Sequence, residues 1–177
     1  MVGPTEFDGT AGEELLRQAV TWVEKAYPCE GCGLVLEADG DLRFVECENL
    51  ADKYHAVDPE TYPRTSRDFY LIDPREFMKA DERGERVAVI VHSHPDVGDY
   101  FSDEDVAAAT MPRMSKEEPL EPVYPGTDYL VVSVRGGRTD GASLFRFDEE
   151  VRGFAAVRRW TAADLGLAAA REPAPAG

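Results

Sequence analysis

The hydrophobic pattern of the first third of the chain predicts one helix and a pair of strands. Apolar residues recur at helical spacing from 12 to 26, with charged residues between them and Pro28 after them, which is typical of an amphipathic helix. Two runs of strand-forming residues, 32–37 and 42–47, flank a short turn that contains Gly40, and they predict a β-hairpin. The polar stretch 49–67, with two prolines, predicts a long loop.

The rest of the chain alternates between strand and helix patterns. Residues 68–72 predict a strand, and Pro74 predicts the start of a short helix that ends near Gly84. The apolar run 87–91 is rich in β-branched residues, as expected of a strand buried on both faces. The remaining predictions are a helix at 102–109, an irregular proline-rich stretch at 110–126, strands at 129–134 and 142–147, a helical or broken helical segment at 149–167, and a disordered tail at 171–177.

This order of elements favours an α+β fold with mixed α/β layers. Because the strands adjoin through hairpins, a mostly antiparallel central sheet flanked by helices is expected, and not a doubly wound parallel sheet. The length of 177 residues predicts one compact domain. We place this domain at 13–160, after a flexible N-terminus, 1–12, and before a C-terminal extension, 161–177.

Charge narrows the classes of partner. The chain has 19 Lys+Arg and 35 Asp+Glu, a formal net charge of -16 at pH 7. Such a surface repels phosphate backbones and anionic lipids, so we expect no nucleic acid and no membrane partner, and a basic face on any protein partner. There is no signal-peptide pattern, and the three cysteines are an odd number. We therefore expect a cytoplasmic protein with free thiols.

Two of the three histidines, His92 and His94, come directly after the apolar strand. Residues two apart in a strand point to the same face, about 6.6 Å apart along it, so both imidazoles can converge on one metal ion. Pro95 removes a ladder donor and ends the strand. The pair is therefore expected at an open edge of the sheet.

Ser102 and Asp105 stand at the start of the next predicted helix and have two interpretations. The first is a helix N-terminus, with Ser102 as the N-cap and Asp105 in the first turn. The second is that the short loop 95–101 folds this helix start over the histidines, so that Asp105 becomes a third ligand. Three protein ligands with one open position are typical of a catalytic zinc site, whereas a structural site fills all four positions.

These residues together resemble a known family. His92, His94, Ser102 and Asp105 match the spacing His-x-His-x7-Ser-x-x-Asp of the JAMM or MPN+ zinc metallopeptidases, also called JAB1/Mov34 domains. Glu30, just before Cys32-Gly33, resembles the family's upstream glutamate, and the similarity extends over residues 13–155. The sequence is most similar to the prokaryotic branch, which includes hydrolases of ubiquitin-like sulfur-carrier proteins and phage-tail-associated peptidases. The resemblance implies a JAB1/MPN-like fold, related to cytidine deaminases.

The resemblance also implies roles for individual residues. His92, His94 and Asp105 would hold Zn²⁺, Glu30 would act as general base and then general acid, and Ser102 would stabilise the oxyanion. The residues alone do not distinguish Glu30 from Glu37, Asp96, Asp99 or Glu104. The implied substrate is a peptide or isopeptide bond at the C-terminus of a ubiquitin-like or sulfur-carrier protein. The oligomeric state is not indicated.

Several alternatives stay open at this point. A phage-tail or cell-wall-associated peptidase fits the same motif, and a non-catalytic MPN-type scaffold would need no metal. A structural zinc domain would need a fourth ligand, which the sequence does not offer. The Cys29-x-x-Cys32 pair follows a helix and opens a strand, contrary to a redox motif. The stretches 52–67 and 110–126 are either solvated loops or the parts that hold the substrate tail.

Overall fold

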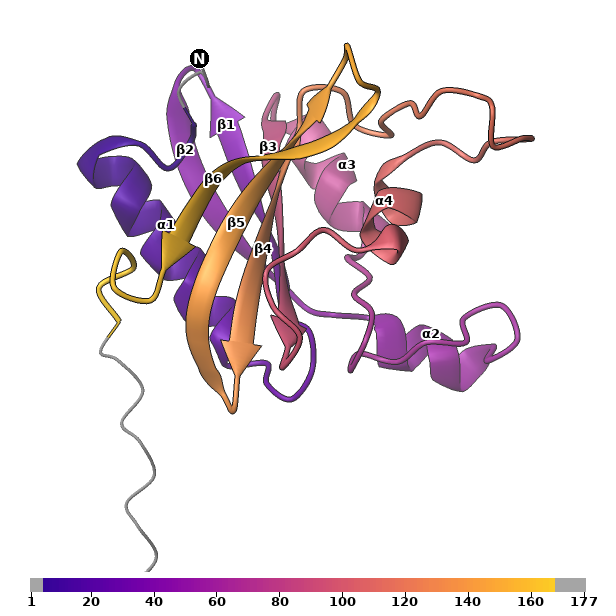
Figure 1. The fold of residues 1–177 in the computed structure, drawn as a ribbon, viewed down its shortest axis with the longest axis horizontal. Helices are drawn as coiled ribbons and strands as arrows, with labels where there is room; N and C mark the ends of the chain where they lie inside the picture. Colours follow the sequence, from indigo (N-terminus) through magenta and orange to yellow (C-terminus); the bar gives the residue numbers. More distant parts are fainter. Residues whose placement is uncertain (1–4, 168–177) are drawn as a thin grey trace, which may run out of the picture.

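The computed structural model describes residues 5–167 and shows one six-stranded sheet with helices on both faces (Figure 1). The strand order is β2-β1-β3-β4-β5-β6, and only the β3–β4 pair is parallel. The predicted α+β fold with a mostly antiparallel sheet is therefore confirmed. The strands are β1 (Cys32–Ala38), β2 (Asp41–Cys47), β3 (Arg86–Pro95), β4 (Asp128–Arg135), β5 (Arg138–Asp148) and β6 (Gly153–Thr161).

The helices divide between the two faces of the sheet (Figure 1). α1 (Gly9–Glu24) covers one face, while α2 (Ala51–Val57), α3 (Pro74–Glu82) and α4 (Asp103–Ala109) lie on the other side. Alternate residues of β3 serve the two faces, because Val89 and Val91 pack with α1 whereas Ile90 packs in the second core. By the same alternation His92 and His94 point to the face of α3 and α4.

The N-terminal helix starts earlier than the sequence predicts. α1 begins at Gly9 and not at residue 12, and Phe7 is fully buried, with its ring edge-on to Trp160 at 5.8 Å. The ordered core therefore includes part of the segment 1–12 that we expected to be flexible. The predicted disordered tail, 171–177, lies outside the described residues.

The prediction of a helical segment at 149–167 is wrong, because residues 153–161 form the edge strand β6. The pairing with β5 contains a β-bulge: Leu144 pairs with Arg158 and Phe145 with Ala156, which leaves Val157 as an extra residue. A bulge breaks the two-residue alternation of side chains. The apolar positions on either side of it therefore lose the strand period by which a strand is recognised.

Two further predictions need correction on the side of the sheet that holds the histidines. Residues 68–72 form no strand; instead, the Leu71 amide donates to Asn49 Oδ1 and the Leu71 carbonyl accepts from the Leu50 amide. The predicted loop 49–67 contains the helix α2, whose single buried residue is Ala51. A helix with one buried position has no apolar stripe from which to predict it.

Among residues 5–167, no helix combines the length and the apolar character needed to cross a bilayer. The three cysteines are free thiols, as predicted.

Candidate metal centre

The carboxyl end of β3 brings two imidazoles together. β3 lies between β1 and β4, where His92 pairs with Cys32 on one side and Val131 on the other. Both histidines are buried, and their Nε2 atoms lie 3.2 Å apart. Ser93, between them, is held elsewhere, because its Oγ accepts a hydrogen bond of 2.8 Å from the Gly31 amide. The strand thus directs two ring nitrogens to one point, as the spacing predicts.

Helix α4 supplies a carboxylate to the same point. The Asp105 amide donates to Ser102 Oγ at 3.1 Å and the Ser102 amide donates to Asp105 Oδ2 at 2.8 Å, a complete capping box. Asp105 Oδ1 lies 3.0 Å from His92 Nε2, and Oδ2 lies 3.3 Å from His94 Nε2. The N-cap interpretation is therefore confirmed, and the same cap places the carboxylate beside the histidines, where the ligand interpretation requires it.

The donor set fits a metal ion. The three ligand atoms of His92, His94 and Asp105 lie within 4.8 Å of one another, and within residues 5–167 the cluster contains no fourth histidine, cysteine or carboxylate. His94 Nδ1 donates to the Gly98 carbonyl at 3.0 Å, so Nε2 is the ring nitrogen that faces Asp105 and His92. Two imidazole nitrogens and one carboxylate are ligands that zinc accepts, with one position left open.

The two histidines and Asp105 shift one another's pKa values, and burial shifts all three. Burial lowers the pKa of His92, which keeps this imidazole neutral and able to bind a metal. Burial would also lower the pKa of His94, but the hydrogen bond and charge of Asp105 raise it. Burial alone would raise the pKa of Asp105, yet the neighbouring His92, with hydrogen bonds from both histidines and Ser102, holds it well below its usual range. The carboxylate is thus charged at neutral pH.

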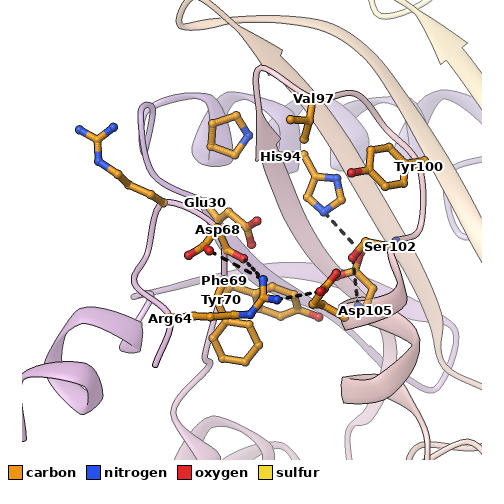
Figure 2. A pocket seen from close by; sticks show the side chains of 13 residues that line it. Glu30, Arg64, Asp68, Phe69, Tyr70, His94, Val97, Tyr100, Ser102 and Asp105 are labelled. Atoms are coloured by element: carbon orange, nitrogen blue, oxygen red, sulfur yellow. Dashed lines mark hydrogen bonds and ion pairs between the residues drawn. The ribbon is translucent and has the colours of Figure 1, made fainter. Parts of the chain in front are cut away.

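Glu30 lies in the pocket beside this cluster. The pocket has a volume of about 200 Å³, and His94, Ser102 and Asp105 line it together with Glu30 (Figure 2). Glu30 is only 6% exposed, and its burial raises its pKa to about 8. This carboxyl group can therefore change its protonation state near neutral pH.

The structure reduces the number of acidic residues that are candidates for the general base. Glu37 accepts from the Gly40 amide in the β1–β2 turn, and Asp99 accepts from the Ser143 hydroxyl. Asp96 accepts from the hydroxyl of Tyr27. None of these three lines the pocket, whereas Glu104 does but is half exposed and paired with Arg64 at 2.7 Å. Glu30 is the buried carboxylate outside the ligand set that faces the pocket.

The sequence analysis did not identify several other residues at this site. Tyr70 stacks on His92 with ring centroids 4.3 Å apart. Tyr100 stands beside His94, and Arg64 extends toward α4 (Figure 2). No local motif marks these residues, because only the tertiary fold brings them to the site. Of the two long stretches singled out, 52–67 contributes Arg64 and Arg67 to this pocket, and 110–126 contributes no lining residue.

The chain is similar to known families and structures. The model of a family described as prokaryotic homologs of the JAB domain matches residues 12–140. A protein of Desulfitobacterium hafniense with a known solution structure is 21% identical, with 81% of this chain and 85% of that chain covered and a TM-score of 0.50. A protein of Salinibacter ruber is 24% identical, with 81% and 84% covered and a TM-score of 0.49. At these identities the first likeness shows a shared fold. No curated protein matches the sequence.

Proposed function

We propose that the chain, which belongs to the family of prokaryotic homologs of the JAB domain, is a zinc-dependent metallopeptidase or isopeptidase. Its substrate would be a peptide or isopeptide bond at the C-terminus of a ubiquitin-like or sulfur-carrier protein. The observation that carries this proposal is the buried His92, His94 and Asp105 cluster, with Glu30 in the same pocket.

His92, His94 and Asp105 would hold the ion through the atoms that already converge in the structure. A bound zinc ion would act as a Lewis acid toward the scissile carbonyl and would lower the pKa of a water molecule to near 7. The chain contributes the hydrogen bond from His94 to Gly98, which holds one ligand ring in orientation. It also contributes the capping box, which holds Asp105.

Glu30 and Ser102 would move the protons and stabilise the developing charge. Since burial raises the pKa of Glu30 to about 8, both forms of its carboxyl group exist near neutral pH. The ionised form would accept a proton from the attacking water, and the protonated form would return it to the leaving amine. Ser102 lines the same pocket, and its single hydroxyl proton is donated to Asp105 Oδ2 at 2.6 Å in this structure. In the reaction this proton would turn from Asp105 to the oxyanion of the substrate. The reaction needs no covalent intermediate on the protein.

A non-catalytic scaffold is the alternative from another class. It would not require three buried donors aimed at one point, nor a buried glutamate with a pKa shifted toward neutrality, and both features are present. Nothing favours a phage-tail or cell-wall peptide over a ubiquitin-like substrate, so substrate screening has to separate them.

Elemental analysis and a cleavage assay test the proposal together. Protein purified without chelator should carry about one zinc per chain, as a single three-ligand site implies, and His92→Ala and Asp105→Ala should lose it. His55→Ala is the matched control, because His55 Nδ1 bonds to the Tyr62 carbonyl away from the cluster, and it should keep the metal. Equal zinc in all four proteins would discard the site.

The second step separates metal binding from catalysis. Glu30→Gln should retain zinc and lose the cleavage of tagged ubiquitin-like and sulfur-carrier proteins, measured by mass. An active Glu30→Gln would assign the base elsewhere. Zinc binding without cleavage of any protein or cell-wall peptide by the native chain would contradict the proposed substrate.

A further inference from the structure

We infer that Tyr70 is a positioning residue: the face of the tyrosine ring orients His92 for the metal. We infer further that Asn49 fixes the backbone around Tyr70 relative to the backbone of Glu30. The inference deepens the proposed function, on whose metal site it rests. It concerns two residues outside the His-x-His and Ser-x-x-Asp motif.

The two histidines are supported in different ways. His94 has a hydrogen bond from its Nδ1 to the Gly98 carbonyl at 3.0 Å. His92 is fully buried, and its Nδ1 has no hydrogen-bond partner among the described residues. A ligating histidine is normally oriented by a bond from its second nitrogen. A different contact must therefore restrain the ring of His92.

Tyr70 provides that contact. Its ring is stacked on the imidazole of His92, with centroids 4.3 Å apart and an angle of 17° between the planes. Rotation of His92 about its Cβ–Cγ bond would tilt the imidazole into the tyrosine ring, so the stacked face limits the angles that the imidazole can adopt. In Figure 2 Tyr70 lies beneath the pocket, next to Asp105. The aromatic face thus substitutes for the missing hydrogen bond.

Hydrogen bonds from Asn49 fix the irregular segment that carries the Tyr70 ring. Tyr70 lies in no strand, but its two neighbours are both bound by one carboxamide: Asn49 Nδ2 donates to the Phe69 carbonyl at 2.9 Å, and Asn49 Oδ1 accepts from the Leu71 amide at 3.0 Å. These two bonds grip the backbone directly before and after Tyr70.

The same carboxamide reaches Glu30. Asn49 Nδ2 also donates to the Glu30 carbonyl at 2.9 Å, and Oδ1 also accepts from the Ala51 amide at 3.0 Å. Both donors and both acceptor sites of the side chain are therefore in use. One residue at the end of the β1–β2 hairpin ties the backbone of the proposed base to the residue that supports a metal ligand.

Tyr100 offers a matched control on the other side of the site. It lies beside His94, but its ring centroid is 5.4 Å away, the planes meet at 60°, and the side chain is half exposed. His94 already has its hydrogen bond to Gly98. Removal of the Tyr100 ring should therefore leave the orientation of the ligand unchanged.

The test measures metal affinity and ligand geometry without reference to activity. Zinc affinity is obtained by competition with a chromophoric chelator, and the visible absorption of the Co²⁺-loaded protein reports the geometry of the ligands. Tyr70→Leu should bind zinc about 10- to 100-fold more weakly and change the Co²⁺ spectrum. Tyr70→Phe, which keeps the ring, and Tyr100→Leu should both resemble the native protein.

The outcomes separate this inference from the proposed function. If the native chain binds neither zinc nor Co²⁺, the proposed function fails. If the native chain binds zinc and a folded Tyr70→Leu binds it equally well, only the role of Tyr70 fails. A Tyr70→Phe variant as weak as Tyr70→Leu would also overturn the inference, because the hydroxyl and not the ring would then matter.

Asn49→Asp provides a second test if Tyr70→Leu does not fold. This substitution keeps the size and both acceptor bonds but removes the donors to Phe69 and Glu30. It should weaken zinc binding and change the Co²⁺ spectrum in the same way as Tyr70→Leu. Native affinity together with a native spectrum in Asn49→Asp would contradict the support of Tyr70 by Asn49.

Discussion

At the scale of single residues, Glu30 makes the stability of the metal-free protein depend on pH. Burial raises its pKa to about 8 from an ordinary value of 4.5. Between these pH values the folded chain binds a proton that the unfolded chain has released, so the free energy of unfolding falls as pH rises through this window. We expect the Glu30 contribution to this loss to be on the order of 3 to 5 kcal/mol by pH 9.

The measurement is urea unfolding with chelator present at pH 5, 7 and 9, for the native chain and for Glu30→Gln. The amide does not titrate, so Glu30→Gln should lose less stability toward pH 9 than the native chain does. The histidines also titrate, but they are present in both proteins and largely cancel in the difference. Parallel pH curves for the two proteins would contradict the raised pKa of Glu30.

Two substitutions can separate the observed N-cap role of Ser102 from its proposed oxyanion role. Both Ser102→Ala and Ser102→Gly remove the hydroxyl that would bind the oxyanion, so both should lower kcat about 10²- to 10³-fold. Alanine is a poor N-cap and should cost about 1 kcal/mol of stability, whereas glycine should cost only a few tenths. Steady-state kinetics and thermal unfolding of the pair provide the check. If instead kcat fell only in the less stable Ser102→Ala variant, Ser102 would act only as the N-cap of α4.

The residues of the site differ in how far the sequence reveals them. His92, His94, Ser102 and Asp105 are close in the chain, so strand and helix geometry alone can bring them together. Glu30 is far from them in sequence, and only the family resemblance distinguished it from four other acidic residues. Tyr70 and Asn49 act through a stacked ring and backbone hydrogen bonds. The family resemblance over residues 13–155 covers both residues but implies no role for either.

At the scale of elements, the contact between α1 and the start of β1 depends on Gly31. A Cβ at this position would lie 2.6 Å from Val23 Cα and 2.9 Å from the Val23 carbonyl oxygen, both backbone atoms of the helix region. Gly31→Ala should therefore push α1 away from the segment that carries Glu30, and destabilise the protein by about 1–3 kcal/mol or more. Gly153→Ala is the control, because nothing lies within 4 Å of its Cβ position and its φ is not positive.

Urea unfolding compares the two glycine variants directly. Gly153→Ala should be close to native in stability, or slightly more stable, because alanine restricts the unfolded chain. Gly31→Ala should also lower cleavage more than zinc content, since Glu30 moves with Gly31 while His92 and His94 remain on β3. Native stability in Gly31→Ala would contradict this prediction, because it would show that α1 can move to accommodate the added Cβ without loss of free energy of unfolding.

The elements recovered from the sequence include those whose own residues carry a strong local signal. β3 is buried along nearly its whole length and α4 begins with a capping box, and both were predicted. β6 was not, because the bulge at Val157 interrupts its alternation. α2 was not, because a single buried residue gives no stripe. In each case the missing information is in the partner element and not in the segment itself.

At the scale of the whole molecule, the net charge of -16 predicts how a substrate protein would be attracted. The size of this charge follows from the sequence, while the structure shows that Arg64 and Arg67 line the pocket beside the histidine cluster. Long-range attraction depends on the summed charge, whereas local fit depends on the side chains at the pocket. A basic partner should therefore be attracted at a distance and selected by different contacts at the site.

Salt separates these two contributions in the proposed cleavage reaction. Raising the ionic strength from about 0.1 M to about 1 M shortens the Debye length from about 10 Å to about 3 Å. For a substrate protein with a basic face, kcat/KM should fall by about tenfold or more, because electrostatic steering sets the rate of encounter. The kcat should change little, since the buried pocket is screened far less than the surface. A short neutral peptide with the same cleavage site is the control, and its kcat/KM should be nearly independent of salt. If both substrates responded equally, or if the basic protein showed no response, the acidic surface would have no part in the recognition of the substrate.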